Sequence, residues 1–265
     1  MFHLSNTVIG ILNFLTFLLS IPILWLGIWL SKHGATECEK LLDKIFIVLG
    51  VFLLLVSLAG LVGACCRVSL LLWIYLIVMF LLIIAVLVST IFAFVVTNKG
   101  AGEVLSGKGY KEYRLGDYSH WLQKRVNDSK YWNTMKSCLR AGQYCSDYQK
   151  LYAKDDANRF SSEKLTPVQS GCCKPSNDCN FVYRSPTVWN KTETANYTNP
   201  DCGAWSNDPN VLCYDCNACK AGIVQDIKTN WKKTAKINII FIIFLIIVYS
   251  IGCCAFRNTR RDGWK

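Results

Sequence analysis

The chain has 265 residues and a formal net charge of +11, and 52% of its residues are hydrophobic while 18% are charged. The apolar residues are gathered into long uninterrupted stretches, a distribution typical of a membrane protein that excludes an ordinary soluble domain. The three histidines lie far apart, at 3, 33 and 120. No nucleophile–base pair or paired-carboxylate cluster is visible, so we expect no catalytic residue and no enzyme.

Four stretches contain no Asp, Glu, Lys or Arg and are long enough to cross the roughly 30 Å hydrocarbon core of a bilayer as helices. We therefore expect four transmembrane helices, at residues 7–30, 45–64, 70–96 and 237–256. Between and around them we expect a cytosolic N-terminus (1–6), a small extracellular loop (31–44), a cytosolic turn (65–69), a large extracellular loop (97–236) and a cytosolic tail (257–265). A cleaved signal peptide is the alternative for the first stretch, which lacks a basic n-region and is too long for one.

No predicted span contains an ionisable side chain, which argues against a transporter, pump or channel because such proteins need these groups within the bilayer. Asn13 in the first span is the sharpest polar feature inside the membrane. An interhelical hydrogen bond there would contribute about 0.6 to 2 kcal/mol, and we favour this structural role over ligand binding. Pro22 in the same span predicts a kink.

The second span is rich in small residues at helical spacing. They are Gly50, Ser57, Gly60, Gly63 and Ala64. Small residues allow helices to approach closely, so we predict that this span is the packing centre of a left-handed bundle.

Four cysteines form two doublets at the predicted cytosolic ends of spans, Cys65 with Cys66 and Cys253 with Cys254. Cysteines beside the membrane in a reducing compartment are candidates for reversible S-palmitoylation. The alternative is that they serve only as small apolar residues near the headgroups. Two doublets at matching depth favour acylation.

The large loop combines nine cysteines with three N-glycosylation sequons, which indicates an oxidising, exoplasmic compartment. The cysteines are Cys138, Cys145, Cys172, Cys173, Cys179, Cys202, Cys213, Cys216 and Cys219, and the sequons are at Asn127, Asn190 and Asn196. The positive-inside rule does not decide the orientation, because basic residues flank both ends of the spans. Cys38 in the small loop lies on the same side, so ten cysteines could form five bridges, with the connectivity open.

The string GCCKPSNDC (171–179) contains adjacent cysteines, which rarely bond to each other because the geometry strains a trans dipeptide. We expect Cys172 and Cys173 to reach two different neighbours and Cys179 a third. Gly171 and Pro175 are expected to shape the turn between them.

The run CYDCNAC (213–219) resembles the cysteine ligands of an iron–sulfur cluster, but the fourth cysteine and the proline of that pattern are absent. We therefore predict disulfides and no metal.

Apolar residues at helical spacing predict a helix in EYRLGDYSHWLQKRVN (112–127) and another in YWNTMKSCLR (131–140). The first contains Leu115, Tyr118, Leu122 and Val126. From about residue 150 to 210 the pattern breaks up, so we expect irregular chain ordered by bridges rather than by a core of its own. After Cys219 an amphipathic segment without proline is expected to continue into the fourth span as one helix.

The four spans, the short first and long second loop, and the cysteine cluster of the long loop together resemble the tetraspanin family over the whole chain. The strings GCCKPSNDC, FLLSIPIL, AFVVTNKGAGE, NPDC and IGCCAFRN are similar to plant tetraspanins, in the subgroup of tetraspanins seven, eight and nine. The fold class is then an all-α membrane protein: a four-transmembrane-helix bundle with a disulfide-rich, partly helical large extracellular loop.

The resemblance implies a helical stalk and a disulfide-bonded variable head in the large loop, palmitoylated cytosolic cysteines, and a cone-shaped bundle able to enclose a sterol or other lipid. It also marks Cys38 as the additional small-loop cysteine of the plant branch. Many members carry an acidic or amide residue in the third or fourth span that faces the first-span asparagine. Here the third span has none and Asn238 of the fourth sits near the outer surface, so the partner of Asn13 is open.

We expect a non-enzymatic membrane scaffold that clusters partner proteins and lipids into microdomains through its large loop. The resemblance adds the plasma membrane and extracellular vesicles as locations, and roles in plant cell differentiation and defence. Expected partners are membrane lipids, other tetraspanins in homo- or hetero-oligomers, and membrane receptors, with no nucleic acid and no cofactor other than a membrane lipid or sterol. The alternative is a cell-surface receptor or co-receptor whose large loop binds an extracellular ligand. A claudin-like protein is excluded because its long loop lies between the first two spans.

Overall fold

The computed structural model describes residues 4–33, 37–66, 68–97, 103–104, 108–191 and 197–262, apart from the side chains of 37–42, 103–104, 232 and 262. The chain divides into two compact units. The membrane unit consists of Met1–Phe92 and Ala235–Lys265, and the loop unit of Ala93–Thr234.

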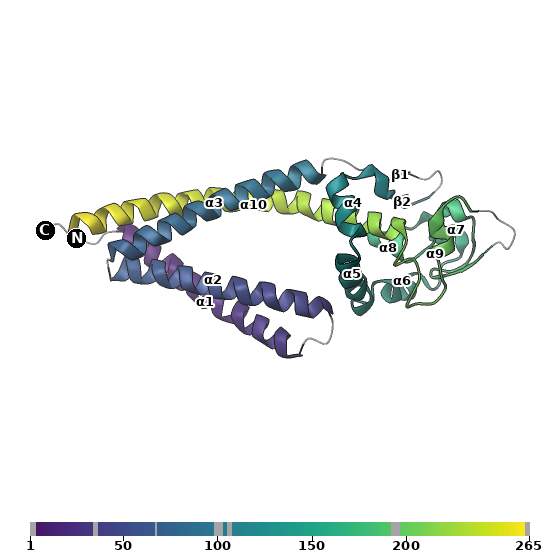
Figure 1. Ribbon diagram of the computed structural model, residues 1–265, viewed down its shortest axis with the longest axis horizontal. Helices are drawn as coiled ribbons and strands as arrows, with labels where there is room; N and C mark the ends of the chain where they lie inside the picture. The colour runs from purple at the N-terminus through teal and green to yellow at the C-terminus, as the bar shows by residue number, and fades with distance from the viewer. Residues whose placement is uncertain are drawn as a thin grey trace. The chain divides into compact units, whose positions relative to one another are not determined.

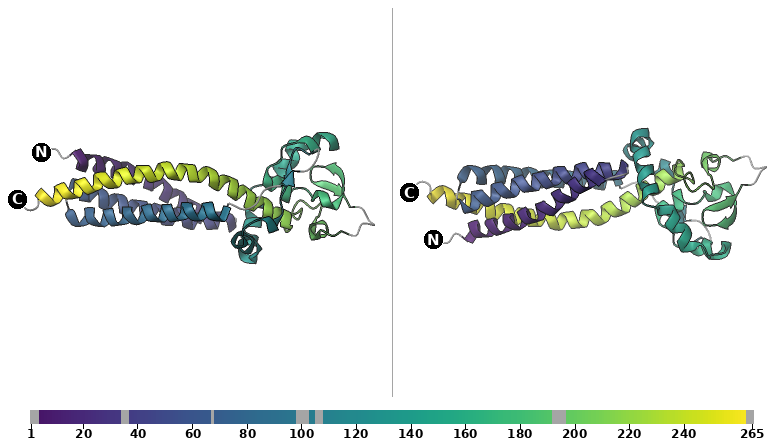
Figure 2. Two further views of the ribbon diagram at one scale, coloured as in Figure 1. Left: turned by 90° about the horizontal axis from the view of Figure 1, so that it is seen from above. Right: turned by 90° about the horizontal axis from the view of Figure 1, so that it is seen from below.

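Four long helices account for the spans: α1 (Leu4–His33), α2 (Glu37–Cys65), α3 (Ser69–Thr97) and α10 (Asn217–Asp262). Each contains a stretch that is long and apolar enough to cross a membrane, as a helix can do because it satisfies its backbone polar groups internally. The prediction of a mostly helical protein with four spans is confirmed. α10 has 46 residues and enters the fourth span without a break, as expected (Figures 1 and 2).

Direct backbone contact between α1 and α2 depends on two glycines, one from each helix. A Cβ atom at Gly27 would lie 2.8 Å from the backbone nitrogen of Ile47, and one at Gly50 would lie 2.9 Å from the Cα of Leu24. Both distances are shorter than real Cβ contacts, so only glycine fits at either position. The two helices accordingly lie side by side (Figure 1).

The other small residues of α2 that the sequence singled out are buried: Ser57, Gly60, Gly63 and Ala64. A Cβ atom at Gly63 would lie 3.0 Å from the backbone nitrogen of Leu72 in α3, so α2 contacts α3 as well as α1. The Ser57 hydroxyl donates to the Leu54 carbonyl at 3.0 Å. This bond within α2 satisfies the hydroxyl in apolar surroundings.

The beginning of α1 and the end of α10 are joined by two side-chain hydrogen bonds and lie together in Figure 2. Asn6 Nδ2 donates to Thr259 Oγ1, and Asn258 Nδ2 donates to Ser5 Oγ, both at 3.2 Å. A hydrophobic cluster lies beside them: Ile9, Ala64, Leu72, Tyr75, Leu76, Met79, Ile83, Leu245, Val248 and Ala255. All four helices therefore meet at this end of the membrane unit.

The loop unit contains short helices and two small hairpins. The helices are α4 (His120–Asn127), α5 (Ser129–Ala141), α6 (Tyr144–Tyr152), α7 (Ala157–Ser162), α8 (Pro167–Cys172) and α9 (Pro200–Ala204), with 3₁₀ turns at Leu115–Asp117 and Asn177–Cys179. The antiparallel hairpins pair β1 (Glu103–Val104) with β2 (Lys111–Glu112), and β3 (Val182–Ser185) with β4 (Val188–Asn190).

The first predicted loop helix is shorter than expected. α4 begins at His120, because Tyr118 and Ser119 are extended and the residues before them form a 3₁₀ turn. The expected apolar residues still pack together, although they do not share one helix. The cluster consists of Val96, Leu115, Tyr118, Leu122, Ala221 and Val224.

The expectation that residues 150–210 lack a core of their own is wrong. Phe160 is 2% exposed and Trp205 1% exposed, and both belong to one continuous cluster that also holds the loop's buried cysteines. Phe160 stacks on Tyr183 with ring centroids 4.9 Å apart and meets Trp189 edge-on. Such pairs contribute about 0.5–1.5 kcal/mol beyond the area they bury. The aromatic residues come from separate short elements, so no local periodicity reveals them.

Replacing Gly50 by alanine is expected to lower the free energy of unfolding by about 1–3 kcal/mol, because the added methyl group must separate two helix backbones. Gly10→Ala is the matched control, since a Cβ atom there would meet only Cys65 Sγ at the ordinary distance of 3.4 Å. Thermal unfolding of the detergent-purified full chain measures both. Equal melting temperatures for the two variants would contradict the proposed backbone contact.

Candidate interaction site in the large loop

Four disulfides organise the described part of the loop unit. They join Cys145 to Cys173, Cys172 to Cys219, Cys179 to Cys202 and Cys213 to Cys216. The adjacent cysteines thus reach different partners: Cys172 bonds to Cys219 at the start of α10, and Cys173 bonds to Cys145 in α6. The bridge to Cys219 spans 47 residues and the Cys213–Cys216 bridge only 3. In the chain-entropy account the longer bridge therefore stabilises the fold more.

Two further cysteines complete the predicted set. Cys138 is disulfide-bonded, whereas the side chain of Cys38 lies outside the described residues. That Cys38 joins the small loop to the large one stays a prediction, which parity supports because the other eight loop cysteines pair with one another.

α8 is the short helix that carries the cysteine doublet. Thr166 and Gln169 form a capping box at its start and Pro167 occupies its first turn, a combination that fixes where a helix begins. A Cβ atom at Gly171 would lie 2.3 Å from the carbonyl oxygen of Ala218, and one at Gly222 would lie 2.3 Å from that of Pro167. α8 therefore packs backbone to backbone on the start of α10. Gly171 was expected to shape a turn, but it lies within α8 and permits this approach.

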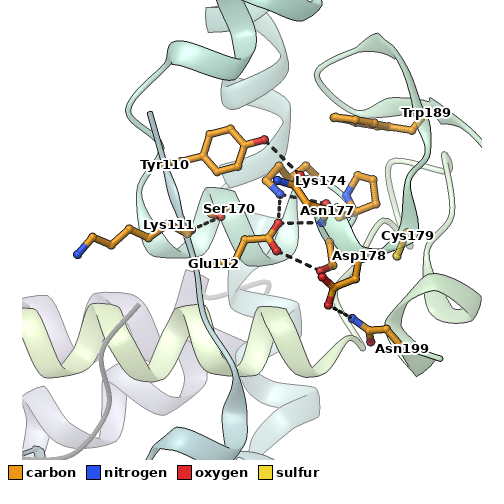
Figure 3. Close-up of polar contacts among 12 residues, drawn as sticks. Tyr110, Lys111, Glu112, Ser170, Lys174, Asn177, Asp178, Cys179, Trp189 and Asn199 are labelled. Atoms are coloured by element: carbon orange, nitrogen blue, oxygen red, sulfur yellow. Dashed lines mark hydrogen bonds and ion pairs between the residues drawn. The ribbon is translucent and has the colours of Figure 1, made fainter. Parts of the chain in front are cut away.

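Lys174 follows the doublet and is fully buried, which the sequence did not reveal. Figure 3 shows its polar contacts. Its Nζ lies 2.6 Å from Glu112 Oε1 and donates to the Pro175 carbonyl at 3.0 Å. The same ammonium group lies 4.6 Å from the centre of the Tyr110 ring, within cation–π range. Burial lowers the pKa of Lys174, and the neighbouring Glu112 charge opposes that shift. The charge is thus desolvated but compensated.

Glu112 ties the turn after Lys174 to strand β2. Besides the lysine, its carboxylate accepts from the Asn177 backbone nitrogen at 2.9 Å and from Ser176 Oγ at 3.2 Å. Ser170 Oγ donates to the Lys111 carbonyl at 2.7 Å (Figure 3). Burial, followed by the Glu112 charge, raises the pKa of Tyr110 to about 12. One carboxylate on β2 therefore holds the whole turn from Lys174 to Asn177, which lies 62–65 residues further along the chain.

Two clefts lie on either side of this turn, and Ser176 lines both. The polar cleft has a volume of ≈ 570 Å³ and is lined among others by Glu112, Arg114, Asp178 and Asn199. The aromatic cleft has a volume of ≈ 360 Å³, and Tyr110 and Trp189 are among its walls. The Lys174–Glu112 pair holds the turn that contributes Ser176 to both clefts, and these are concave surfaces on which the described loop unit could bind another molecule.

The polar cleft is closed at one end by the start of α10. Both carboxylate oxygens of Asp201 accept hydrogen bonds there, from the backbone nitrogens of Asn217 and Ala218, each at 2.8 Å. A carboxylate at a helix N-terminus satisfies free backbone donors and complements the helix dipole. Asp201 thereby fixes α9 against α10 next to the Cys172–Cys219 bridge.

Two sequon asparagines are described, and both are exposed. Asn127 ends α4, and its Oδ1 accepts a hydrogen bond from Lys220 Nζ at 3.0 Å. Asn190 ends β4. The third, Asn196, lies outside the described residues.

The four cysteines predicted to be acylated are free thiols at the end of the membrane unit where α1 begins and α10 ends. Cys65, Cys66 and Cys254 are exposed, and Cys253 is half-buried. All four side chains are at least partly accessible to a modifying enzyme.

Asn13 is buried in the membrane unit, and the sequence left its partner open. Its Nδ2 donates to the Ile9 carbonyl at 2.9 Å, and the Tyr75 hydroxyl of α3 is within hydrogen-bonding reach of the same amide. A Cβ atom at Gly60 would lie 2.4 Å from Asn13 Oδ1. The hydrogen bond of Asn13 thus lies within α1, and the nearby side chain from the third span is a tyrosine, which a search for acidic or amide residues overlooks. Asn238 instead donates to Thr90 Oγ1 at 3.4 Å.

Comparison with known proteins identifies relatives over the whole chain. A family model described as Tetraspanin family matches residues 5–255. Tetraspanin-7 of Arabidopsis thaliana is 61% identical over 264 residues, covering 100% of both chains. Tetraspanin-8 of the same plant is 60% identical, covering 97% of this chain and 94% of its own, and Tetraspanin-4 is 43% identical, covering 97% and 79%. No solved structure matches.

Lys174→Met is expected to lower the free energy of unfolding by about 3–5 kcal/mol, because Glu112 loses its counter-charge in a largely buried position. Adding Glu112→Gln should restore part of the loss by removing that charge. The control is Lys136→Met, whose ion pair with Asp215 is 2.8 Å long but partly exposed and should contribute about 1 kcal/mol or less. Unfolding of the full chain in detergent measures all three, and equal losses for Lys174→Met and Lys136→Met would contradict the buried-pair account.

Gly171→Ala is expected to prevent correct pairing of the cysteine doublet, because its methyl group would collide with the backbone of α10. Gly203→Ala is the control in the same loop, since nothing lies within 4 Å of a Cβ atom there. Non-reducing peptide mapping should find Cys172–Cys219 in the control and mixed partners in the Gly171 variant. Native pairing in both would show that α8 and α10 can separate without cost.

Proposed function

The chain belongs to the tetraspanin family of multi-pass membrane proteins, and from this we propose that it is a non-enzymatic scaffold of the plasma membrane. In this proposal the large loop binds partner membrane proteins, including other tetraspanins and receptors, and the lipidated helices gather the assembly into microdomains. Extracellular vesicles and roles in plant cell differentiation and defence belong to the same proposal.

The proposed topology rests on how cysteine chemistry divides along the chain. The loop cysteines are disulfide-bonded, whereas Cys65, Cys66, Cys253 and Cys254 are free thiols. Disulfides persist in oxidising compartments and free thiols in reducing ones. This supports placing 31–44 and 97–236 outside the cell, and 1–6, 65–69 and 257–265 in the cytosol.

Partner binding by the large loop is supported by its rigid, concave surface. The buried Lys174–Glu112 pair and the disulfides order the two clefts, so a partner need not pay for folding the site. Weak lateral contacts become effective in a membrane because confinement raises the local concentration of partners. Acyl chains on the four free cysteines would add affinity for thicker, ordered membrane.

The receptor or co-receptor reading is the second candidate, and the polar cleft favours it. Its ≈ 570 Å³ are lined by carboxylates, amides and Arg114, a donor and acceptor set that suits a small polar ligand. The scaffold function requires acylation and lateral partners, whereas binding of an extracellular ligand by a receptor does not.

Treatment of the cell-surface protein with an N-glycosidase is expected to increase its gel mobility, because Asn127 and Asn190 are exposed. The triple variant Asn127→Gln, Asn190→Gln and Asn196→Gln should already run at the faster position. Protease added to intact protoplasts should remove the large loop and spare a C-terminal tag. Loss of the tag with the loop retained would reverse the proposed topology.

Replacing Cys65, Cys66, Cys253 and Cys254 by serine is expected to reduce severalfold the set of membrane proteins that co-purify in mild detergent, because clustering then relies on the loop alone. Gly203→Ala is the matched control, as it leaves the cysteines and the clefts intact. Proximity labelling from the large loop in intact cells should show the same loss. An unchanged partner set, together with tight binding of one small extracellular ligand, would favour the receptor instead.

A further inference from the structure

The C-terminal end of α10 carries a groove whose arginines have no part in the proposed scaffold function. The groove has a volume of ≈ 530 Å³ and is lined by Cys253, Phe256, Arg257, Arg260 and Arg261. Each of these residues lies three or four positions from another along the sequence, so together they form a single stripe along one face of the helix. We call this surface the arginine groove.

Packing on the opposite face fixes the direction of this stripe. Gly252, Ala255 and Thr259 are buried, and a Cβ atom at Gly252 would lie 2.9 Å from Leu76 Cδ2. Thr259 also accepts the hydrogen bond from Asn6 at 3.2 Å. These contacts define the face of α10 that packs on the other helices, and Arg257, Arg260 and Arg261 are exposed outside that face.

The charge of the groove is not balanced within the described structure. Among the side chains described in 4–261, none places a carboxylate within ion-pair distance of Arg257, Arg260 or Arg261. A guanidinium group presents a planar fork of donors that matches phosphate oxygens. Two such forks one turn apart can hold one phosphate from both sides.

The position of the groove along the helix indicates where that phosphate comes from. The apolar stretch of the fourth span ends at Phe256, and the three arginines follow it directly. Side chains one or two turns beyond a span lie at the depth of lipid headgroups. Phe256 and Cys253 at the other end of the groove lie at the depth of the acyl chains.

We propose that the arginine groove binds the phosphorylated headgroup of an anionic membrane lipid, with Arg257 and Arg260 or Arg261 on the phosphate and Phe256 against the lipid's apolar part. This proposal rests on the proposed function in one respect only: the proposed topology decides which leaflet of the membrane supplies the lipid. The plainer explanation is that cations at a helix C-terminus complement the helix dipole. Any cation serves the dipole, whereas a phosphate clamp needs the guanidinium fork, and this difference provides the test.

The full chain is reconstituted in nanodiscs of phosphatidylcholine with a small fraction of a phosphatidylinositol monophosphate, and bound lipid is counted by native mass spectrometry. Arg257→Gln, Arg260→Gln and Arg261→Gln together are expected to lower the apparent affinity by about a hundredfold, since each basic residue near an anionic surface contributes about fivefold. The matched control is Lys233→Gln with Lys236→Gln, which removes exposed charges from the opposite end of the same span. The control should retain the lipid.

Two further measurements distinguish a phosphate clamp from simple charge attraction, and a lipid from a free phosphate. Replacing the three arginines by lysine keeps the charge and should still weaken binding severalfold; full binding by that variant would overturn the clamp in favour of simple charge attraction. Free inositol phosphate should compete poorly, and competition as strong as that of the lipid would overturn the lipid assignment. Wild-type binding by the glutamine variant would overturn the proposal altogether. Because a nanodisc exposes both leaflets, an error in the proposed topology would not change these results.

Discussion

The contact between α8 and the first turns of α10 is the constraint on which the loop unit depends. Backbone atoms meet across Gly171 and Gly222, and the Cys172–Cys219 bridge joins the same two helices. Neither glycine can carry a side chain without moving a helix. Because α10 continues as the fourth span, the doublet is attached to a helix that the membrane itself holds in place.

The course of the chain after α8 follows from that contact. Cys173 turns away to α6, and Lys174 is carried into the interior, where Glu112 compensates its charge. A buried ion pair adds little stability over an apolar pair of the same size, but losing one partner is costly. Its contribution here is therefore the definition of one geometry: the turn from Lys174 to Asn177 and the clefts on both of its sides.

The membrane unit is organised by different means, because lipid removes the hydrophobic driving force between helices. Close backbone contacts at Gly27, Gly50 and Gly63 provide the packing. A few polar groups that would be unsatisfied in hydrocarbon find partners, as Asn13 does with the Ile9 carbonyl. At the end where α1 and α10 are hydrogen-bonded, this packing leaves one face of α10 free, and the arginines lie on that face.

Local composition determined much of this protein. Uninterrupted apolar stretches predicted the four spans, the lack of proline after Cys219 predicted the continuous α10, and the geometry of a dipeptide predicted that Cys172 and Cys173 would have different partners. Tertiary structure alone decided which cysteines pair, why Gly171 is a glycine and that Lys174 is buried. It also decided that Tyr75 lies near Asn13 and that aromatic residues between 150 and 210 are packed in a core. Spans and helices depend on neighbours within a few residues, which the sequence displays directly. Bridges, buried charges and aromatic clusters depend on residues brought together from distant segments, and their positions are defined only once the chain has folded.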